Sequence, residues 1–386
     1  MNSLLYALFE ALRCHRWLRL LACAFIFSSL GNGLTQVVVF GLLLQWSAPS
    51  ALLTLAFLFA TVPGYIGSLI GEKLCQRFSP LYLLMLTEWL GLLALLFPLS
   101  GAHYHSIPAL LAVQSTEALL SGMSWPALTL LFKRGLHEAE LPAATCLENV
   151  IFASQVLLGT GLGVVLFQRI PVFALLVIDA ASFMGSLVML FLAERQYVAR
   201  PAPLPVGDPQ PVALRWQTLT LRQKRSLLIL PALAAVGSPA MALLPALAQQ
   251  INPENAAGLA LPLLFARSLG QLCGPLLLRK ESLTRFAAML PFLSAWVVLA
   301  LGMIFIAHLA SNIVFAAGTF GVLSNFQAIQ ISAASGKAWR WQTLSASLFT
   351  GLAAMTATIL GAAQTLYAVS AIALLLVALV LAHYRE

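Results

Sequence analysis

The sequence predicts an all-α membrane protein with twelve transmembrane helices arranged as two six-helix bundles. Of its 386 residues, 60% are hydrophobic and 9% are charged, whereas soluble domains average roughly 45–50% apolar and about 25% charged residues. The mean hydropathy is +0.92. The apolar residues also form about a dozen separate stretches, each close to the roughly 20 residues that cross a bilayer as a helix. A soluble core does not account for this composition.

The apolar stretches fall into two sets of six. The first set is predicted at 17–45, 51–72, 81–100, 107–132, 142–168 and 172–193. The second set is predicted at 226–249, 256–278, 286–308, 310–335, 342–363 and 364–383. These sets define an N-terminal bundle over 17–193 and a C-terminal bundle over 226–386.

Residues 1–16 precede the first span and have a different pattern. Leu4, Leu8 and Phe9 belong to one apolar helical stripe, and Arg13 and Arg16 follow just before the long apolar run. Such a segment is typical of a helix that lies in the membrane interface. Because a small-residue cleavage site is lacking there, we expect an interfacial helix rather than a signal peptide.

Basic residues alternate between connections, and this sets the predicted orientation. The basic connections contain Lys73 and Arg77, Lys133 and Arg134, Arg195 to Arg225, Arg279 to Arg285, and Lys337 and Arg340. By the positive-inside rule they are cytoplasmic, which predicts a multi-pass protein of the bacterial inner membrane with both termini in the cytoplasm. The basic residues behind the net charge of +8 lie in these short loops, where they contact anionic lipid headgroups. We therefore do not expect binding to nucleic acid.

The segment 194–225 is the one long polar stretch of the chain. It contains five prolines and several basic residues, which predicts a cytoplasmic linker and not a packed domain. Two six-helix halves joined by such a linker are the layout of the major facilitator fold. In this fold the substrate binds near the midplane, between halves that rock to give alternating access.

Several motifs carry a more specific resemblance. In order, the chain contains SSLGNGLTQVVVF, SGMSWPALTLLF, LPAATCLENV, LLGTGLGVVLF and IDAASFMGSL. Their order and spacing resemble the branch of the major facilitator superfamily that contains the enterobactin exporter and the macrolide efflux proteins. The resemblance implies export from the cytoplasm by a monomer, and it covers the N-terminal half, whereas the C-terminal half agrees only by hydropathy.

The loop after the second span resembles a conserved cytoplasmic gate of this fold. The family's loop carries an Asp and an Arg, and here Gln76 stands in place of the Asp while Arg77 matches the Arg. Gln76 and Arg77 are therefore the predicted cytoplasmic gate. Because Gln76 cannot form an ion pair, the latch is expected to be weaker or to rely on Glu72.

Five ionisable residues fall at span depth, where they are costly and mark functional candidates. They are Glu88, Glu117, Glu148, Asp179 and Arg267. A desolvated carboxyl group suits proton exchange, and Glu117 and Glu148 are the predicted proton-coupling residues.

Each acid also has a structural interpretation. Glu148 would cap a helix or pair with Lys133 or Arg134. Glu88 would have a structural partner outside the cavity, and Asp179 would pair with Arg169.

Arg267 is predicted to lie roughly 18 Å from the cytoplasmic surface, at 1.5 Å per helical residue. Its guanidinium suits bidentate contact with a carboxylate or catecholate, although an internal ion pair with an N-terminal acid is an equal alternative. The complete predicted substrate site is Asn32, Gln36, Arg267, Gln271, Asn325 and Gln327.

Small and aromatic residues complete the candidates. Gly159, Gly161 and Gly163 predict a close approach of another helix in the fifth span. Trp125 and Trp339 are interpreted as interface anchors or packing residues and not as ligands.

These observations predict a proton-driven exporter of a small molecule. The family resemblance implies a siderophore as the substrate, and Arg267 makes the carboxylate type the sharper hypothesis. Multidrug or macrolide efflux is the alternative within transport. A lipid-handling or signalling protein without proton coupling is the alternative of another class. No nucleotide-binding, hydrolase or metal motif occurs, and the five cysteines lack paired spacing, so we expect no enzyme activity, cofactor, metal or disulfide framework. The expected partners are the substrate, protons and membrane lipids.

Overall fold

In the computed structural model the described residues are 4–46, 56, 58–167, 169–197, 214–251, 315–316, 318–365 and 368. Within these ranges the chain forms helices joined by short turns, without strands. The predicted spans at 256–278 and 286–308 lie outside the described residues, and so does nearly all of 364–383.

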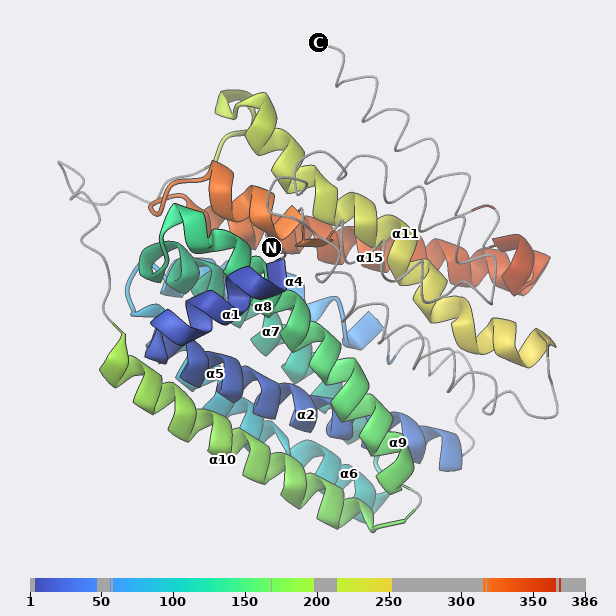
Figure 1. The fold of residues 1–386 in the computed structure, drawn as a ribbon. Helices are drawn as coiled ribbons and strands as arrows, with labels where there is room; N and C mark the ends of the chain where they lie inside the picture. The colour runs from blue at the N-terminus through green and yellow to red at the C-terminus, as the bar shows by residue number, and fades with distance from the viewer. Residues whose placement is uncertain are drawn as a thin grey trace.

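The first half of the chain contains most of the described helices (Figure 1). They are α1 (Leu4–Cys14), α2 (Arg16–Gln45), α4 (Pro63–Leu74), α5 (Pro80–Ala94), α6 (Leu96–Tyr104), α7 (Ile107–Gly135), η1 (Glu138–Glu140), α8 (Leu141–Ser154), the π-helical segment η2 (Gln155–Gly161), α9 (Leu162–Phe167) and α10 (Val172–Gln196). The second half contributes η3 (Trp216–Thr218), α11 (Leu221–Ile251), a helical segment that ends at residue 325, and α15 (Ile331–Leu360).

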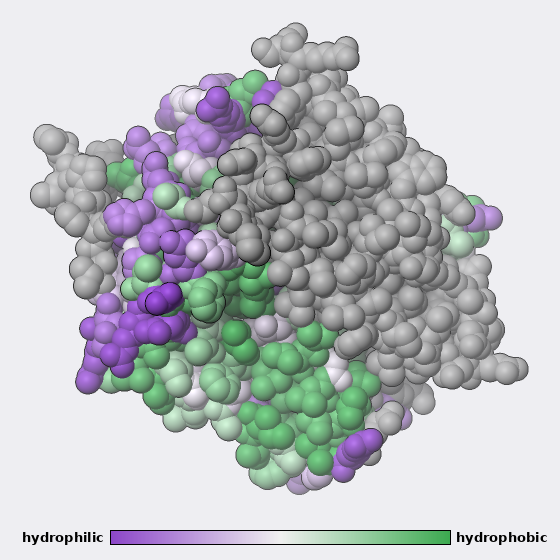
Figure 2. All heavy atoms as spheres, viewed as in Figure 1, coloured by the Kyte–Doolittle hydropathy of each residue, from purple (hydrophilic) through white to green (hydrophobic). Residues whose placement is uncertain are grey.

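Among the described residues, five helical stretches are long and apolar enough to cross a membrane: Arg16–Leu43, Pro80–Tyr104, Glu138–Phe167, Val172–Gln196 and Ile331–Leu360. Figure 2 shows a broad apolar surface below, over α10 and its neighbours, while polar residues gather on the left. On α10 the outward-facing side chains include Phe173, Val177 and Phe191, which are 64%, 50% and 47% exposed. Such a surface suits contact with lipid chains.

Basic residues gather at one end of the helix bundle, which we call the basic end. It is the end at which α2 begins and α4, α7 and α10 end, and it carries Arg16, Lys73, Arg77, Lys133, Arg134 and Arg195. The first residues of α11 and α15 lie at the same end (Figure 1). This is the end that the charge pattern predicts to be cytoplasmic.

Within each half the helices pack in pairs, α2 with α10, α4 with α7, and α11 with α15. The two halves meet where α15 packs against α4 and α7. Glycines allow the α4–α7 contact, because a Cβ on Gly64 would lie 3.1 Å from the carbonyl oxygen of Ala118, and Gly122 faces the backbone of Gly64 even more closely. We call the contact of α4, α7 and α8 with α15 and residues 315–325 the seam.

The predicted boundary between the tenth and eleventh spans, 310–335 and 342–363, is wrong. Residues 326–330 form a non-helical turn, and a single helix, α15, then runs from Ile331 to Leu360. Lys337 and Arg340 therefore lie inside a helix and not in a loop. The Lys337 ammonium donates to the carbonyl of Leu214 at 3.1 Å and Arg340 pairs with Glu72, so contacts within the protein accommodate both charges.

Helix α1 occupies the predicted N-terminal segment and packs against α8 and η1. Its buried side chains are Leu4, Ala7, Leu8 and Ala11, whereas Phe9 is 66% exposed. The predicted apolar stripe is thus divided. Leu4 and Leu8 contact the protein, and Phe9 projects away from it.

Candidate functional site

A cavity of ≈ 320 Å³ lies between the two halves. From the first half it is lined by residues of α2, α5, α7, α8, η2 and α10, and from the second by residues of α11, α15 and Phe315. The predicted proton-coupling residues Glu117 and Glu148 both line it, and so do Asn32 and Glu88. The fold therefore brings together four residues that are far apart in the sequence.

Glu88 lies on α5 and is 6% exposed. The hydroxyl of Ser28, on α2, donates to Glu88 Oε1 at 2.9 Å, and Oε2 has no hydrogen-bond partner among the described residues. The sequence predicted a structural position outside the cavity, whereas Glu88 has a structural partner and also lines the cavity.

Asp179 has the structural role that one interpretation predicted, but with other partners. It is fully buried on α10, where it accepts hydrogen bonds from the hydroxyls of Thr35 and Ser182. The expected partner Arg169 is not one of them. A Cβ on Gly31 would collide with the Asp179 carboxyl group, so α2 and α10 pack closely around this acid.

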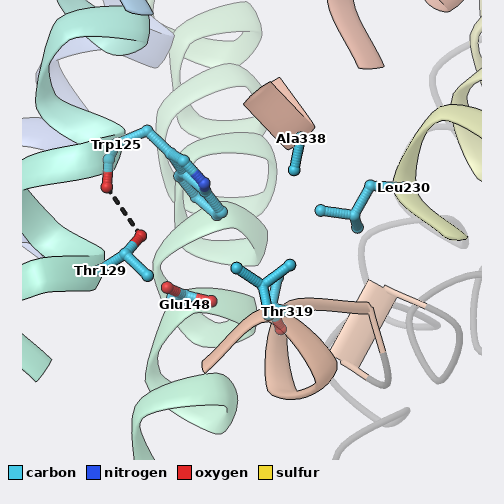
Figure 3. Close-up of a pocket in the computed structure, with 7 residues that line it drawn as sticks. Trp125, Thr129, Glu148, Leu230, Thr319 and Ala338 are labelled. Atoms are coloured by element: carbon cyan, nitrogen blue, oxygen red, sulfur yellow. Dashed lines mark hydrogen bonds between the residues drawn. The ribbon is translucent and has the colours of Figure 1, made fainter. Parts of the chain in front are cut away.

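Glu148 lies on α8, is 4% exposed and sits at the seam. A second, much smaller pocket beside it has a volume of ≈ 10 Å³ and is lined by Trp125, Thr129, Leu230, Thr319, Val322 and Ala338. Figure 3 shows the Glu148 carboxyl group between Thr129 of the first half and Thr319 of the second. The predicted pairing with Lys133 does not form, because the Lys133 ammonium donates to the carbonyl of Leu323 at 2.7 Å.

Aromatic side chains form the part of the cavity wall near the seam. The rings of Trp125 and Trp339 lie 5.0 Å apart, and Phe315 lies 6.3 Å from Trp125 and 6.2 Å from Phe152. Trp125 and Trp339 both line the cavity and pack against each other, so of the two sequence interpretations the structure favours packing residues over interface anchors.

The other predicted substrate residues are not brought together. Gln36 is half-buried on α2 and is not among the cavity residues. Asn325 and Gln327 lie at the turn before α15, at the basic end, where Asn325 donates to the hydroxyl of Ser226 at 2.9 Å. Their predicted place in a cavity-lining span is corrected accordingly. Arg267 and Gln271 lie outside the described residues.

Two amides of the cavity wall, Gln155 and Gln342, were not predicted from the sequence. Gln155 is the first residue of η2. Gln342 lies on α15, at the position where the eleventh span was predicted to begin. The only signal available was a polar amide within an apolar run, and it does not specify which face of the helix the amide occupies.

The basic end of the seam is closed by an ion pair. Arg340 of α15 contacts Glu72 of α4 at 2.7 Å, and the two side chains are 14% and 22% exposed. The predicted gate residues Gln76 and Arg77 are both exposed beyond the end of α4. The cross-half contact is therefore made by Glu72, the residue on which the weakened latch was expected to rely.

Three comparisons relate the chain to known proteins. No family model matches it. A protein of 29.9 kDa encoded in the crtE 3′ region of Pseudescherichia vulneris, which is itself uncharacterised, is 55% identical over 74 residues. This match covers 19% of this chain and only 27% of that relative.

Solved structures that resemble the chain include transporters. The human organic anion transporter MFSD10 (TETRAN) matches with a TM-score of 0.68 at 15% identity, over 93% of this chain and 96% of that one. FucP, a major facilitator superfamily transporter in the outward conformation, matches with a TM-score of 0.68 at 13% identity, over 95% and 98%. A bacterial homologue of the iron transporter ferroportin in its outward-facing state matches with a TM-score of 0.70 at 12% identity, over 96% and 99%.

The helical architecture and these matches define the fold. The chain has the major facilitator fold of all-α membrane proteins, with its cavity between the two halves.

Proposed function

We propose that the chain is a proton-driven transporter that moves a small molecule across the bacterial inner membrane by alternating access. The observation that carries the proposal is a cavity between two halves, with carboxyl groups in its wall and an ion pair across the seam at one end. In this fold, rocking of the two halves around such a cavity opens it to each side of the membrane in turn.

Glu117 and Glu148 are the proposed proton-coupling residues. Both line the cavity, and neither is paired with a Lys or Arg among the described residues. A carboxyl group without a counter-ion inside a membrane protein neutralises its charge most readily by binding a proton. Each is therefore able to carry a proton between the two sides when the halves rock.

The cavity wall suggests the class of substrate. Its described residues include three carboxyl groups and six aromatic side chains, Phe25, Trp125, Phe152, Phe183, Phe315 and Trp339, and no Lys or Arg. Aromatic faces and carboxylates attract cations. This part of the wall favours an amphipathic cation, as in the drug or macrolide alternative. Siderophore export rests on the family resemblance, and its carboxylate type rests on Arg267.

The direction of transport rests on the family resemblance and on charge. The motifs resemble exporters, and the basic end is proposed to face the cytoplasm with both termini and the linker 194–225. The fold neighbours do not favour one substrate, since they include an organic anion transporter, a homologue of an iron transporter and a fucose:proton symporter. We propose export by a monomer, without a cofactor.

Reconstitution in liposomes tests the proposal. Purified protein is placed in vesicles with an acidic interior that contain a pH-sensitive dye, and ethidium or an iron-free carboxylate siderophore is added outside. We expect ethidium to accumulate while the interior loses protons. Glu117→Gln and Glu148→Gln should abolish proton-driven accumulation, while Glu138→Gln, at an exposed residue of η1, should not.

The same assay separates the alternatives. Accumulation of the siderophore that is lost in Arg267→Ala would favour siderophore export. Transport that is independent of the pH gradient, in the native protein and in both Gln variants, would reject proton coupling. It would favour the lipid-handling or signalling alternative.

A further inference from the structure

The small pocket beside Glu148 lies between the two halves. Trp125 and Thr129 come from α7 and Glu148 from α8, whereas Leu230, Thr319 and Ala338 come from the second half. Glu148 and Trp125 also line the central cavity. The carboxyl group therefore stands where the cavity meets the seam.

The pocket offers little to an ionised carboxylate. Glu148 Oε2 is buried and has no hydrogen-bond partner among the described residues. The hydroxyl proton of Thr129 is donated to the carbonyl of Trp125 at 2.8 Å, drawn as a dashed line in Figure 3, and that of Thr319 to the carbonyl of Ala316 at 3.2 Å. Both hydroxyls can still accept a hydrogen bond through a lone pair.

Water cannot supply the missing donor at Oε2, which is buried, although the carboxyl group also borders the central cavity. The pocket volume of ≈ 10 Å³ is at the lower limit of the roughly 10–15 Å³ that one water needs, and a carboxylate is hydrated by several waters. A buried carboxylate without donors is strongly disfavoured, whereas a protonated carboxyl group needs one acceptor. The closed seam thus fits the protonated form of Glu148.

No other titratable side chain lines the small pocket within the described part of the chain. Glu88 and Glu117 line the central cavity together with Glu148. Lys133, at the end of α7, is directed to the carbonyl of Leu323. Thr319 is the polar group through which the second half contacts the carboxyl group (Figure 3).

We infer that Thr319 is a positioning residue by which the second half responds to the protonation of Glu148, so that the seam closes on the protonated carboxyl group and opens on the ionised one. The inference rests on the proposed function and adds the residue that links proton binding to movement. One proton passes from water in the central cavity to Glu148 while the basic end is closed and leaves to water on the other side of the membrane after the basic end has opened, and no other bond changes. In the closed seam the Glu148 O–H donates to Thr319 Oγ1.

Distances across the seam test this inference without a transport assay. Spin labels are attached to Ser79→Cys and Ser324→Cys, two exposed positions in different halves at the basic end, in a background without the native cysteines. The protein is measured in lipid nanodiscs between pH 5 and pH 9. In the native sequence we expect the closed population to fall as the pH rises, with a slope of one proton.

Three variants define the outcome. Thr319→Val should lower the closed-to-open ratio at acidic pH by roughly three- to tenfold, as loss of one hydrogen bond predicts, and Thr319→Ser should restore it. Thr350→Val removes another buried hydroxyl, one that has no partner among the described residues, and should leave the pH profile unchanged. Thr350→Val is the matched control for loss of a hydroxyl in the same half.

Failure of the inference is distinguishable from failure of the proposed function. If Glu148→Gln abolishes the pH dependence of closure but Thr319→Val behaves like the native sequence, Thr319 has no such role while proton coupling by Glu148 stands. If Glu148→Gln retains the native pH dependence, then Glu148 is not the responding group, and Glu117→Gln and Glu88→Gln identify which acid is. That result overturns both the inference and the proposed role of Glu148.

Discussion

Arg340 of α15 and Glu72 of α4 form an ion pair of 2.7 Å that joins the two halves at the basic end. Both side chains are mostly shielded from solvent, and the pair lies beside Gly336, where a Cβ would be 3.0 Å from Glu72 Oε2. The absence of a side chain at Gly336 thus lets the carboxylate approach α15. Because Lys133 also reaches across the seam to Leu323, two separate polar contacts hold this end closed.

Breaking the ion pair should open the basic end. A partly shielded, charge-assisted hydrogen bond contributes about 1–2 kcal/mol, between the values for exposed and buried pairs, which corresponds to roughly a 5- to 30-fold change in the closed-to-open ratio. We expect this change in both Glu72→Gln and Arg340→Gln, measured with the spin-label pair described above. The exchanged pair, Glu72→Arg with Arg340→Glu, should recover part of the closed population. An unchanged ratio in both single variants would show that the pair does not hold the seam.

Cys75 provides a chemical measure of the same opening. It is the residue after α4, is 6% exposed, and lies near Glu72. Burial raises the pKa of the Cys75 thiol to about 12, with Arg134 acting to lower the pKa and Glu72 to raise it. Since the thiolate is the reactive form, the closed protein should react slowly with maleimide at pH 8, and the rate should rise with pH.

We expect Arg340→Gln to accelerate this reaction at pH 8, because an exposed thiol has a pKa near 8.5. The experiment uses a chain in which Cys75 is the single remaining cysteine. A chain that retains only the exposed Cys14 is the control, and its rate should be unaffected by Arg340→Gln. Equal acceleration at both cysteines would indicate general loosening of the fold instead of opening of the seam.

The course of the chain was predictable where hydropathy and charge agree. The predicted spans 17–45 and 172–193 correspond to α2 and α10 within a few residues. At α15 the two signals conflict, because Lys337 and Arg340 resemble a cytoplasmic loop, and only their partners in the folded protein explain how a helix accommodates them. The hydropathy pattern alone does not reveal which residues pair with Lys337 and Arg340 in the folded protein.

The site was less predictable, because the rotation of each helix decides which residues face the cavity. Asn32 and Gln36 lie one helical turn apart and were expected to share a face, yet only Asn32 lines the cavity. Trp339 was interpreted as an interface anchor or a packing residue, and its ring lies 5.0 Å from that of Trp125 in the cavity wall. Glu117 and Glu148 were identifiable because a charge within an apolar span is costly wherever it faces.

Gly159 should be intolerant of any side chain. It lies in η2, where a Cβ would be 2.6 Å from Gly33 Cα and 2.9 Å from the carbonyl oxygen of Ser29. These are backbone atoms that cannot rotate away, so Gly159→Ala should separate α2 from η2 at a cost of about 1–3 kcal/mol. Lower thermal unfolding temperature in detergent is the expected result. Gly185→Ala on α10, where nothing lies within 4 Å, should not lower it. A similar loss in both variants would mean that the close approach to α2 is not responsible.

The two faces of α1 should respond differently to truncation. Leu8 is 5% exposed on the face that packs against α8, whereas its neighbour Phe9 is 66% exposed. Leu8→Ala removes buried methyl groups and should destabilise the protein by about 2–4 kcal/mol, measured as a lower unfolding temperature in detergent. Phe9→Ala is the matched control, and should leave that temperature nearly unchanged.

Measurements in lipid nanodiscs and in detergent distinguish the packing of α1 against α8 from the anchoring of α1 in the membrane interface. If Phe9 sits in the membrane interface, Phe9→Ala should weaken protection of α1 from amide hydrogen exchange in nanodiscs while having little effect in detergent, because only the bilayer supplies an interfacial layer. Leu8→Ala should weaken protection in both. Equal effects of Phe9→Ala in the two environments would contradict the interfacial position of α1 and leave its contact with α8 as the reason that the helix forms.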